Sequence, residues 1–124
     1  MKRVVLVGLD PVTVDFSDPA LPPGMTVEKI QDGVKLALTG MAERGWVAEV
    51  CFIKPDETAV LTLERHLAAN RYDCVVIGAG VRLPAKHLNL FEALVNTIHR
   101  CAPQTSIAFN TGPIDSGAAA ARWI

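Results

Sequence analysis

The sequence predicts an α/β fold, a three-layer domain built on a four-stranded parallel sheet in the strand order 2-1-3-4. Two apolar runs without polar alternation, Arg3–Leu9 and Cys74–Ile77, are typical of strands that are buried on both faces of a parallel sheet. Segments with helical spacing of apolar residues follow the strands, so the chain alternates as βαβαβαβα. In the order 2-1-3-4, the chain adds the second strand on one side of the first strand and the third strand on the other. With right-handed crossovers, a crevice opens at the carboxyl ends of the first and third strands, where this change of side occurs.

Composition predicts a single α/β domain over residues 1–124, because a chain of this length buries roughly two-thirds of its unfolded surface around one core. Lys and Arg number 12 against 13 Asp and Glu, so no net field attracts nucleic acid or an anionic membrane, and we expect neither as a partner. No apolar run approaches the roughly 20 residues of a membrane span, and the first strand starts too early for a signal peptide. Three widely spaced cysteines, expected to be buried thiols, suit a cytoplasmic protein: Cys51, Cys74 and Cys101.

A long connection follows the first strand. The segment Pro11 to Gly24 is rich in proline, which excludes helix and central strand, and it exceeds the about 2 to 6 residues that usually join a strand to a helix. It is therefore interpreted either as a loop that closes over a site or as a passive surface insertion. A helix begins after Thr26, a suitable N-cap, and ends before Gly45. Gly33 and Gly40 lie inside this helix, where they suggest a close approach to the sheet.

The later elements follow from the same patterns. Glu49 suits an edge position on the second strand. Asn89 and Glu92 predict a capping box at the start of the third helix, and Asp115 or Ser116 would cap a last short helix. The remaining expected strands and helices are Trp46–Ile53, Ala59–Ala69, Asn89–Cys101 and Ser106–Asn110.

The crossovers leave one part of the sheet without a predicted cover. They place the first helix on one face and the next two helices on the other, so the first face lacks a helix over strands three and four. Only the terminal AAAARWI segment, the proline-rich loop or another subunit can cover it. We therefore expect a homo-oligomer with Trp123 and Ile124 in or beside the contact, with coverage by the last helix alone as the alternative.

Three turns converge on the predicted crevice: Gly8–Pro11, Gly78–Arg82 and Asn110–Pro113. Glycines there allow close approach of the backbone and leave amide donors that can bind an anion. The leading hypothesis is therefore a site for a small anionic metabolite, with ordinary turn geometry and a solvated arginine as alternatives. Arg82 would supply a fork-shaped charge, Asp10 would bind a hydroxyl or an amine, and His87 would border the crevice. The expected ligand-binding residues are Asp10, Gly78, Gly80, Arg82, His87 and Thr111.

Known motifs do not define a cofactor or a metal. The run Gly78–Leu83 begins like a dinucleotide fingerprint, but it lacks the third glycine and follows the third strand. The chain has no phosphate-binding P-loop and no G-x-S-x-G elbow, and no two histidines share a helix at i and i+4.

The architecture is similar to flavodoxin-like domains and to response-regulator receiver domains, from the first strand to about Gly112. In receivers the phosphate-accepting aspartate ends the third strand, where this chain has Gly78, and the acidic pair after the first strand is reduced to Asp10. Thr111 matches the hydroxyl residue after the fourth strand, but the fifth strand with its lysine is absent. The resemblance implies the fold, and it adds a second hypothesis: a non-catalytic, receiver-like interaction or oligomerisation module. Acid–base catalysis by His87 with Asp10 is a third.

Overall fold

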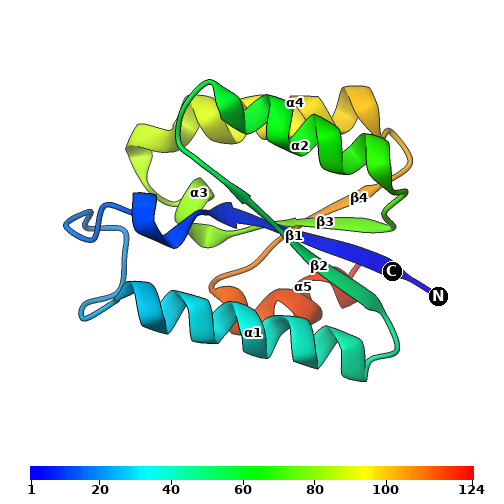
Figure 1. The fold of residues 1–124 in the computed structure, drawn as a ribbon, viewed down its shortest axis with the longest axis horizontal. Helices are drawn as coiled ribbons and strands as arrows, with labels where there is room; N and C mark the ends of the chain where they lie inside the picture. Colours follow the sequence, from blue (N-terminus) through cyan, green and yellow to red (C-terminus); the bar gives the residue numbers. More distant parts are fainter.

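A computed structural model describes residues 1–124 and shows the predicted sheet (Figure 1). All strand pairs are parallel and the order is β2-β1-β3-β4, so the three-layer, flavodoxin-like α/β fold is confirmed. Leu6 of the central strand pairs with Val50 on one side and Val76 on the other. The strands are β1 (Arg3–Leu9), β2 (Val47–Ile53), β3 (Cys74–Ile77) and β4 (Ser106–Phe109).

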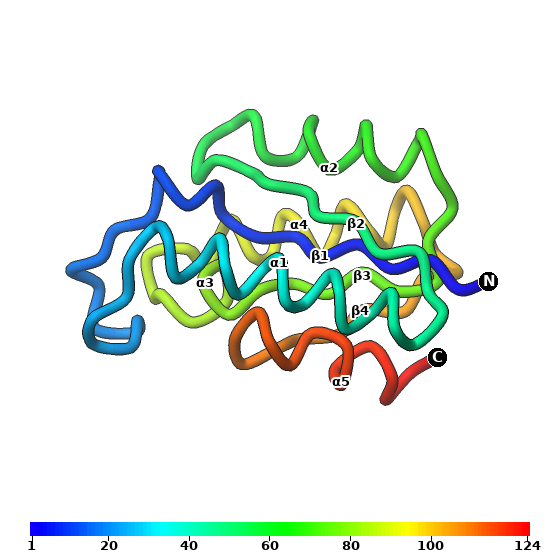
Figure 2. Tube along the Cα trace, turned by 60° about the horizontal axis from the view of Figure 1, so that its bottom comes forward, coloured from blue at the N-terminus to red at the C-terminus, as the bar shows by residue number.

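Helices cover both faces of the sheet. α2 (Thr58–Ala69) and α4 (Leu88–Cys101) pack against each other on one face, and α1 (Val27–Glu43) and α5 (Ser116–Ala121) share the other (Figures 1 and 2). The short α5 contacts β3, β4 and α1. It therefore covers the part of the sheet that the crossovers leave bare, which the sequence analysis kept open between this helix, the loop and another subunit. None of the helices combines the length and the apolar character needed to cross a bilayer.

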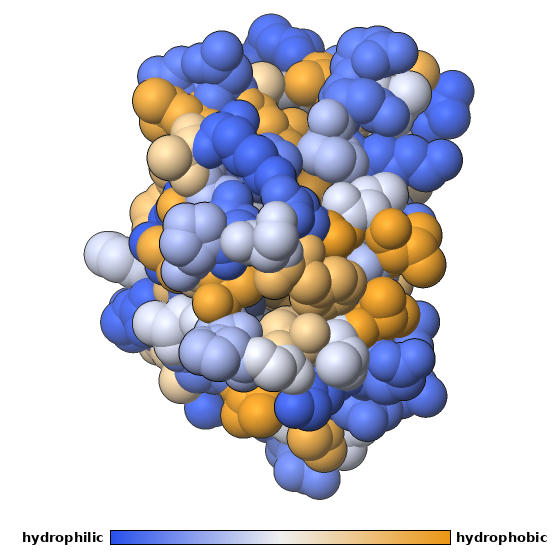
Figure 3. Space-filling view, turned by 90° about the vertical axis from the view of Figure 1, so that its left-hand side faces the viewer, coloured by the Kyte–Doolittle hydropathy of each residue, from blue (hydrophilic) through white to orange (hydrophobic).

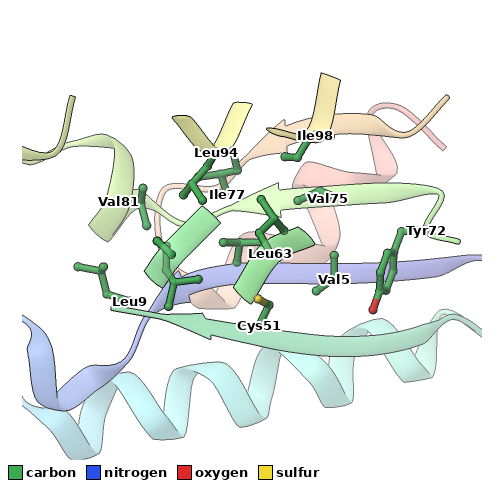
Figure 4. Packing of buried hydrophobic residues seen from close by; sticks show 13 residues of the cluster. Val5, Leu9, Cys51, Leu63, Tyr72, Val75, Ile77, Val81, Leu94 and Ile98 are labelled. Carbon is green, nitrogen blue, oxygen red and sulfur yellow. The ribbon is translucent and has the colours of Figure 1, made fainter. Parts of the chain in front are cut away.

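The core has two parts because successive strand residues point to opposite faces. Val5 and Val75 face α2 and α4, where they meet Leu63, Leu94 and Ile98 (Figure 4). The other face joins the sheet to α1 and α5, and its members include Val4, Leu6, Val76, Met41 and Ala119. All four residues of β3 are buried, as expected for a strand covered on both sides.

Polar contacts join the strands at the amino ends of the sheet. The Arg3 backbone N–H donates to the Asp73 carboxylate at 2.9 Å, and the Arg3 guanidinium pairs with Glu49. Tyr72 donates its hydroxyl to Glu49 at 2.6 Å; burial and this carboxylate raise the pKa of Tyr72 to about 12. Glu49 lies on the edge strand β2, as predicted, and its charge is paired there.

Several local predictions are wrong. α4 begins at Leu88, because the 3-10 helix Ala85–His87 leads directly into it; Asn89 therefore lies inside the first turn and forms no capping box. The turn after β3 contains a short helix, α3 (Ala79–Arg82). Cys101 is exposed at the end of α4, whereas the other two cysteines are buried.

Two of the glycines in α1 and α5 mark close packing, and one does not. A Cβ on Gly33 would lie 3.3 Å from Pro113, so this glycine admits the turn after β4 and not the sheet itself. A Cβ on Gly117 would lie 3.1 Å from Arg44 Nε and 3.3 Å from Met41 Cγ. Nothing lies within 4 Å of the corresponding position on Gly40, so the close approach predicted there is wrong.

Candidate functional site

A cavity of about 140 Å³ lies at the carboxyl ends of the strands, on the α1 face. Figure 3 shows this end of the molecule, where apolar residues gather across the middle of the surface between hydrophilic regions. Hydrophobic residues make up 10 of the 18 that line the cavity, so it suits an apolar group. Its walls come from the strands (Leu6, Gly8, Leu9, Val50, Phe52), α1 (Ile30, Val34), the long loop (Val14, Leu21, Pro22, Met25) and the turns (Gly78–Gly80, Asn110–Pro113).

Gly8 leaves the floor of this cavity open. Strand alternation puts Leu6 and Gly8 on the α1 face, while Val7 and Leu9 face α2 and α4. A Cβ built on Gly8 would meet no atom within 4 Å. The missing side chain in an otherwise apolar strand therefore creates space in which a ligand can lie against the sheet.

The connection from Pro11 to Gly24 forms the roof. It starts with the 3-10 helix Pro11–Thr13, which Asp10 caps by accepting the Val12 N–H at 3.2 Å. Val14 and Leu21 of this loop line the cavity, which places the loop over the crevice.

Lys86 tethers this roof to the segment before α4. Its ammonium nitrogen lies 2.5 Å from Asp15 Oδ2 and 4.0 Å from Asp18 Oδ2. Hydrogen bonds from Lys86 and Ser17 hold the pKa of Asp15 well below its ordinary value of 3.8. His87 borders a small second hollow next to this tether and does not line the main cavity.

Removing the tether should loosen the roof. In Lys86→Gln we expect lower hydrogen-exchange protection of the Leu21 amide, which in the wild type donates to Asp18 O at 3.1 Å. The pKa of Asp15 is lower in the folded protein than in the unfolded chain. The stability that the Asp15–Lys86 pair adds is therefore complete above about pH 3.8, and it is lost as the pH falls through the folded-state pKa. Added salt should weaken the tether as well, because the pair is partly exposed. Lys35→Gln, on the exposed face of α1, is the control; equal protection in both variants would contradict the tether.

Asn110 connects the two turns at the rim. This side chain is 2% exposed; its Oδ1 accepts the Ala79 N–H at 2.8 Å, and its Nδ2 donates to Ser116 Oγ at 2.9 Å. The amide thus joins the start of α3 to the start of α5. From the sequence, Asn110 was placed at the end of a strand and in a turn at the crevice, and no role was predicted for its side chain.

The backbone amides of the turn after β4 are already hydrogen-bonded to a carboxylate of the same chain. The Asp115 carboxylate accepts the Thr111 N–H at 3.0 Å, the Gly112 N–H at 3.2 Å and the Thr111 hydroxyl at 2.6 Å. Burial alone would raise the pKa of Asp115, but these hydrogen bonds outweigh it and lower the pKa. The prediction of free amide donors in this turn is therefore wrong. Asp115 precedes α5, but it makes no side-chain capping bond to that helix.

The structure brings together part of the predicted set of site residues. Gly78, Gly80 and Thr111 line the cavity. Asp10 and Arg82 lie outside the lining: Arg82 donates to Asn110 O at 2.9 Å, and its guanidinium lies 5.7 Å from the centroid of the Phe109 ring.

The apolar lining from α1 and the loop was missed because its residues had been assigned to the core or to a surface loop. The feature of the sequence that could have indicated the cavity is Gly8, which interrupts the apolar residues of β1.

The chain contains no group of three or more His, Cys, Asp or Glu side chains placed to hold a metal ion. Comparison with family models, curated proteins and solved structures found no match to this chain. The fold and the site define this protein as a flavodoxin-like α/β domain with a roofed apolar cavity at the carboxyl end of its sheet.

Proposed function

We propose that this domain binds a small metabolite with an apolar body and one anionic or polar end, at the carboxyl ends of strands β1, β3 and β4. The observation that carries the proposal is the roofed, mostly apolar cavity of about 140 Å³. An apolar cavity of roughly 150 Å³ accommodates a molecule the size of benzene. The ligand is therefore small, and its apolar part is the part that is enclosed.

The polar end of the ligand belongs at the rim, beside Gly78, Gly80 and Thr111. A charge buried among the side chains of Leu6 and Val34 would lose its hydration without compensation, so it must stay near backbone donors and solvent. The Gly80 N–H, in the turn after β3, donates none of the backbone hydrogen bonds of that turn, so it can donate to the ligand. Since Asp115 occupies the neighbouring amides, one small polar group fits this rim better than a phosphate that needs several donors.

Binding without chemistry accounts for the site better than acid–base catalysis. Asp10 and His87, the pair of the catalytic hypothesis, both lie outside the cavity lining. The Asp10 carboxylate is used to cap the 3-10 helix Pro11–Thr13. No titratable side chain is among the residues that line the cavity.

The test is to fill the floor of the cavity. We would titrate linear carboxylic acids of increasing length, and the matching alcohols, into the full chain and follow the amide resonances of Gly78, Gly80 and Thr111. Wild type should bind roughly fourfold more tightly per added CH₂ until the cavity is full, since each buried CH₂ contributes about 0.8 kcal/mol. Gly8→Leu should abolish these shifts.

Gly40→Leu is the matched control, because the same substitution there meets open space outside the cavity. It should bind like wild type. No response of the lining resonances to any probe, or equal binding by Gly8→Leu and wild type, would refute the proposal. Equal binding of acids and alcohols would show that the ligand needs no anionic end, and it would leave the proposal of an enclosed apolar body in place.

A further inference from the structure

The outer edge of β4 is unpaired by any strand. β3 lies on its other side, and the Ser106 N–H donates to Asp73 O at 3.0 Å. Ser106 and Ala108 therefore direct their backbone groups towards β3. Because these directions alternate along a parallel strand, the N–H and C=O of Ile107 and Phe109 point away from the sheet.

The residues of β4 themselves lack the features that protect the other edge, and the one charge shown on this edge comes from Arg122, which donates to Phe109 O. β2 carries Glu49, whose charge is paired with Arg3 and hydrogen-bonded by Tyr72. The four residues of β4, SIAF, include no charge and no proline, the features that commonly prevent edge-to-edge pairing. Of the two edges of the sheet, β4 is therefore the one suited to receive another strand.

The hydrogen-bonding groups along this edge match a second copy of the same strand. Two outward groups are already satisfied: Thr105 N–H donates to Ala102 O at 3.0 Å, and Phe109 O accepts from Arg122 Nη2 at 3.0 Å. An antiparallel copy centred on Ile107 would exchange both hydrogen bonds between the two Ile107 residues. Phe109 N–H of each copy would donate to Thr105 O of the other, so the pairing does not need the two satisfied groups.

Exposed apolar residues belong to the strand and to the two helical segments that contact it, α4 and the segment of α5. On the α4 face, Phe109 is 39% exposed, and its ring centroid lies 5.5 Å from that of Phe91; Leu88, one turn earlier on α4, is 59% exposed. On the α5 face, Trp123 is 61% exposed next to Arg122, whose guanidinium reaches the edge.

We propose that two copies of this chain associate through β4, antiparallel across a two-fold axis at Ile107, and so extend the sheet from one protomer into the other. A second copy is favoured over a foreign peptide because the satisfied and unsatisfied groups are arranged symmetrically about Ile107, as an isologous contact requires. The contact is independent of the cavity, whose lining contains none of the β4 strand residues Ser106–Phe109.

The test compares the association of the full chain with that of a chain methylated on the Ile107 backbone nitrogen. Cys101 allows a synthetic segment of residues 101–124 to be ligated to the rest of the chain, so only this atom changes. The methyl group removes an outward donor and keeps the Ile107 side chain and the β3 pairing. In sedimentation equilibrium, wild type and the unmodified ligated protein should approach twice 13.3 kDa as concentration rises, and the methylated protein should stay at 13.3 kDa.

Amide hydrogen exchange gives a second readout that does not need a variant. At rising wild-type concentration, exchange should slow at Ile107 and Phe109 and stay constant at Ala108, whose N–H already faces β3. Wild type that remains at 13.3 kDa, or a methylated protein that still dimerises, would overturn the proposal. Protection of Ile107 only after addition of an unrelated strand-forming peptide would assign the edge to another partner and overturn self-association as well.

Discussion

Asn110→Ala should lower the free energy of unfolding by about 2–3 kcal/mol. The substitution removes the hydrogen bonds to Ala79 N–H and Ser116 Oγ, and the Ala79 amide then has no acceptor in the protein at a partly buried position. The Ser116 hydroxyl keeps its hydrogen bond to Pro113 O at 2.6 Å. The lost bond between Asn110 and Ser116 therefore accounts for the smaller part of the expected destabilisation. Chemical denaturation should show a lower midpoint with an unchanged dependence on denaturant concentration, because folded and unfolded surfaces stay the same.

Two further variants separate this role from general damage to the turn. Thr111→Ala changes the next, exposed residue and should cost well under about 1 kcal/mol. Asn110→Asp keeps an acceptor for Ala79 but buries a carboxyl group, whose pKa should rise in the folded state. Relative to wild type at the same pH, its stability should therefore recover as the pH falls through that raised pKa. A loss below about 0.5 kcal/mol in Asn110→Ala would show that Asn110 does not join the two turns.

Leu63→Ala should lower the free energy of unfolding by about 3 kcal/mol. Leu63 is fully buried on α2 and points into the cluster that Val5, Val75 and Ile98 form between the sheet and the helices (Figure 4). The substitution removes buried apolar atoms and leaves a void that the surrounding strands cannot close, since they are hydrogen-bonded in register on both sides.

Leu61→Ala is the control from the same helix. Leu61 is 50% exposed, so the same substitution should change the free energy of unfolding by no more than about 0.5 kcal/mol. Denaturation curves of both variants, measured together, test whether α2 presents the face that carries Leu63 to the sheet. Equal losses at the two positions would show that the helix is rotated from the orientation described here.

The candidate site was predictable in position and only partly in chemistry. The turns at Gly78 and Thr111 were expected to converge because parallel strands end at the same edge of a sheet, and both now line one cavity. The partner of each backbone amide could not be predicted, because it depends on distances of a few tenths of an ångström between segments. Asp115 takes the amides expected to bind an anion, and Arg82 turns towards Phe109 and Asn110 O.

The sequence by itself determined the strand order and the doubly buried character of Cys74–Ile77. Apolar strands alternate with amphipathic helices along the chain, and right-handed crossovers between them leave few possible strand orders. Each of these patterns can be recognised from neighbouring residues in the sequence. Only the tertiary structure decided that α5 covers β3 and β4, that Gly8 leaves a space beneath the loop, and that β4 ends the sheet with free backbone groups. Those features depend on which side chains from distant segments fill the same volume, and no periodicity in the sequence records that.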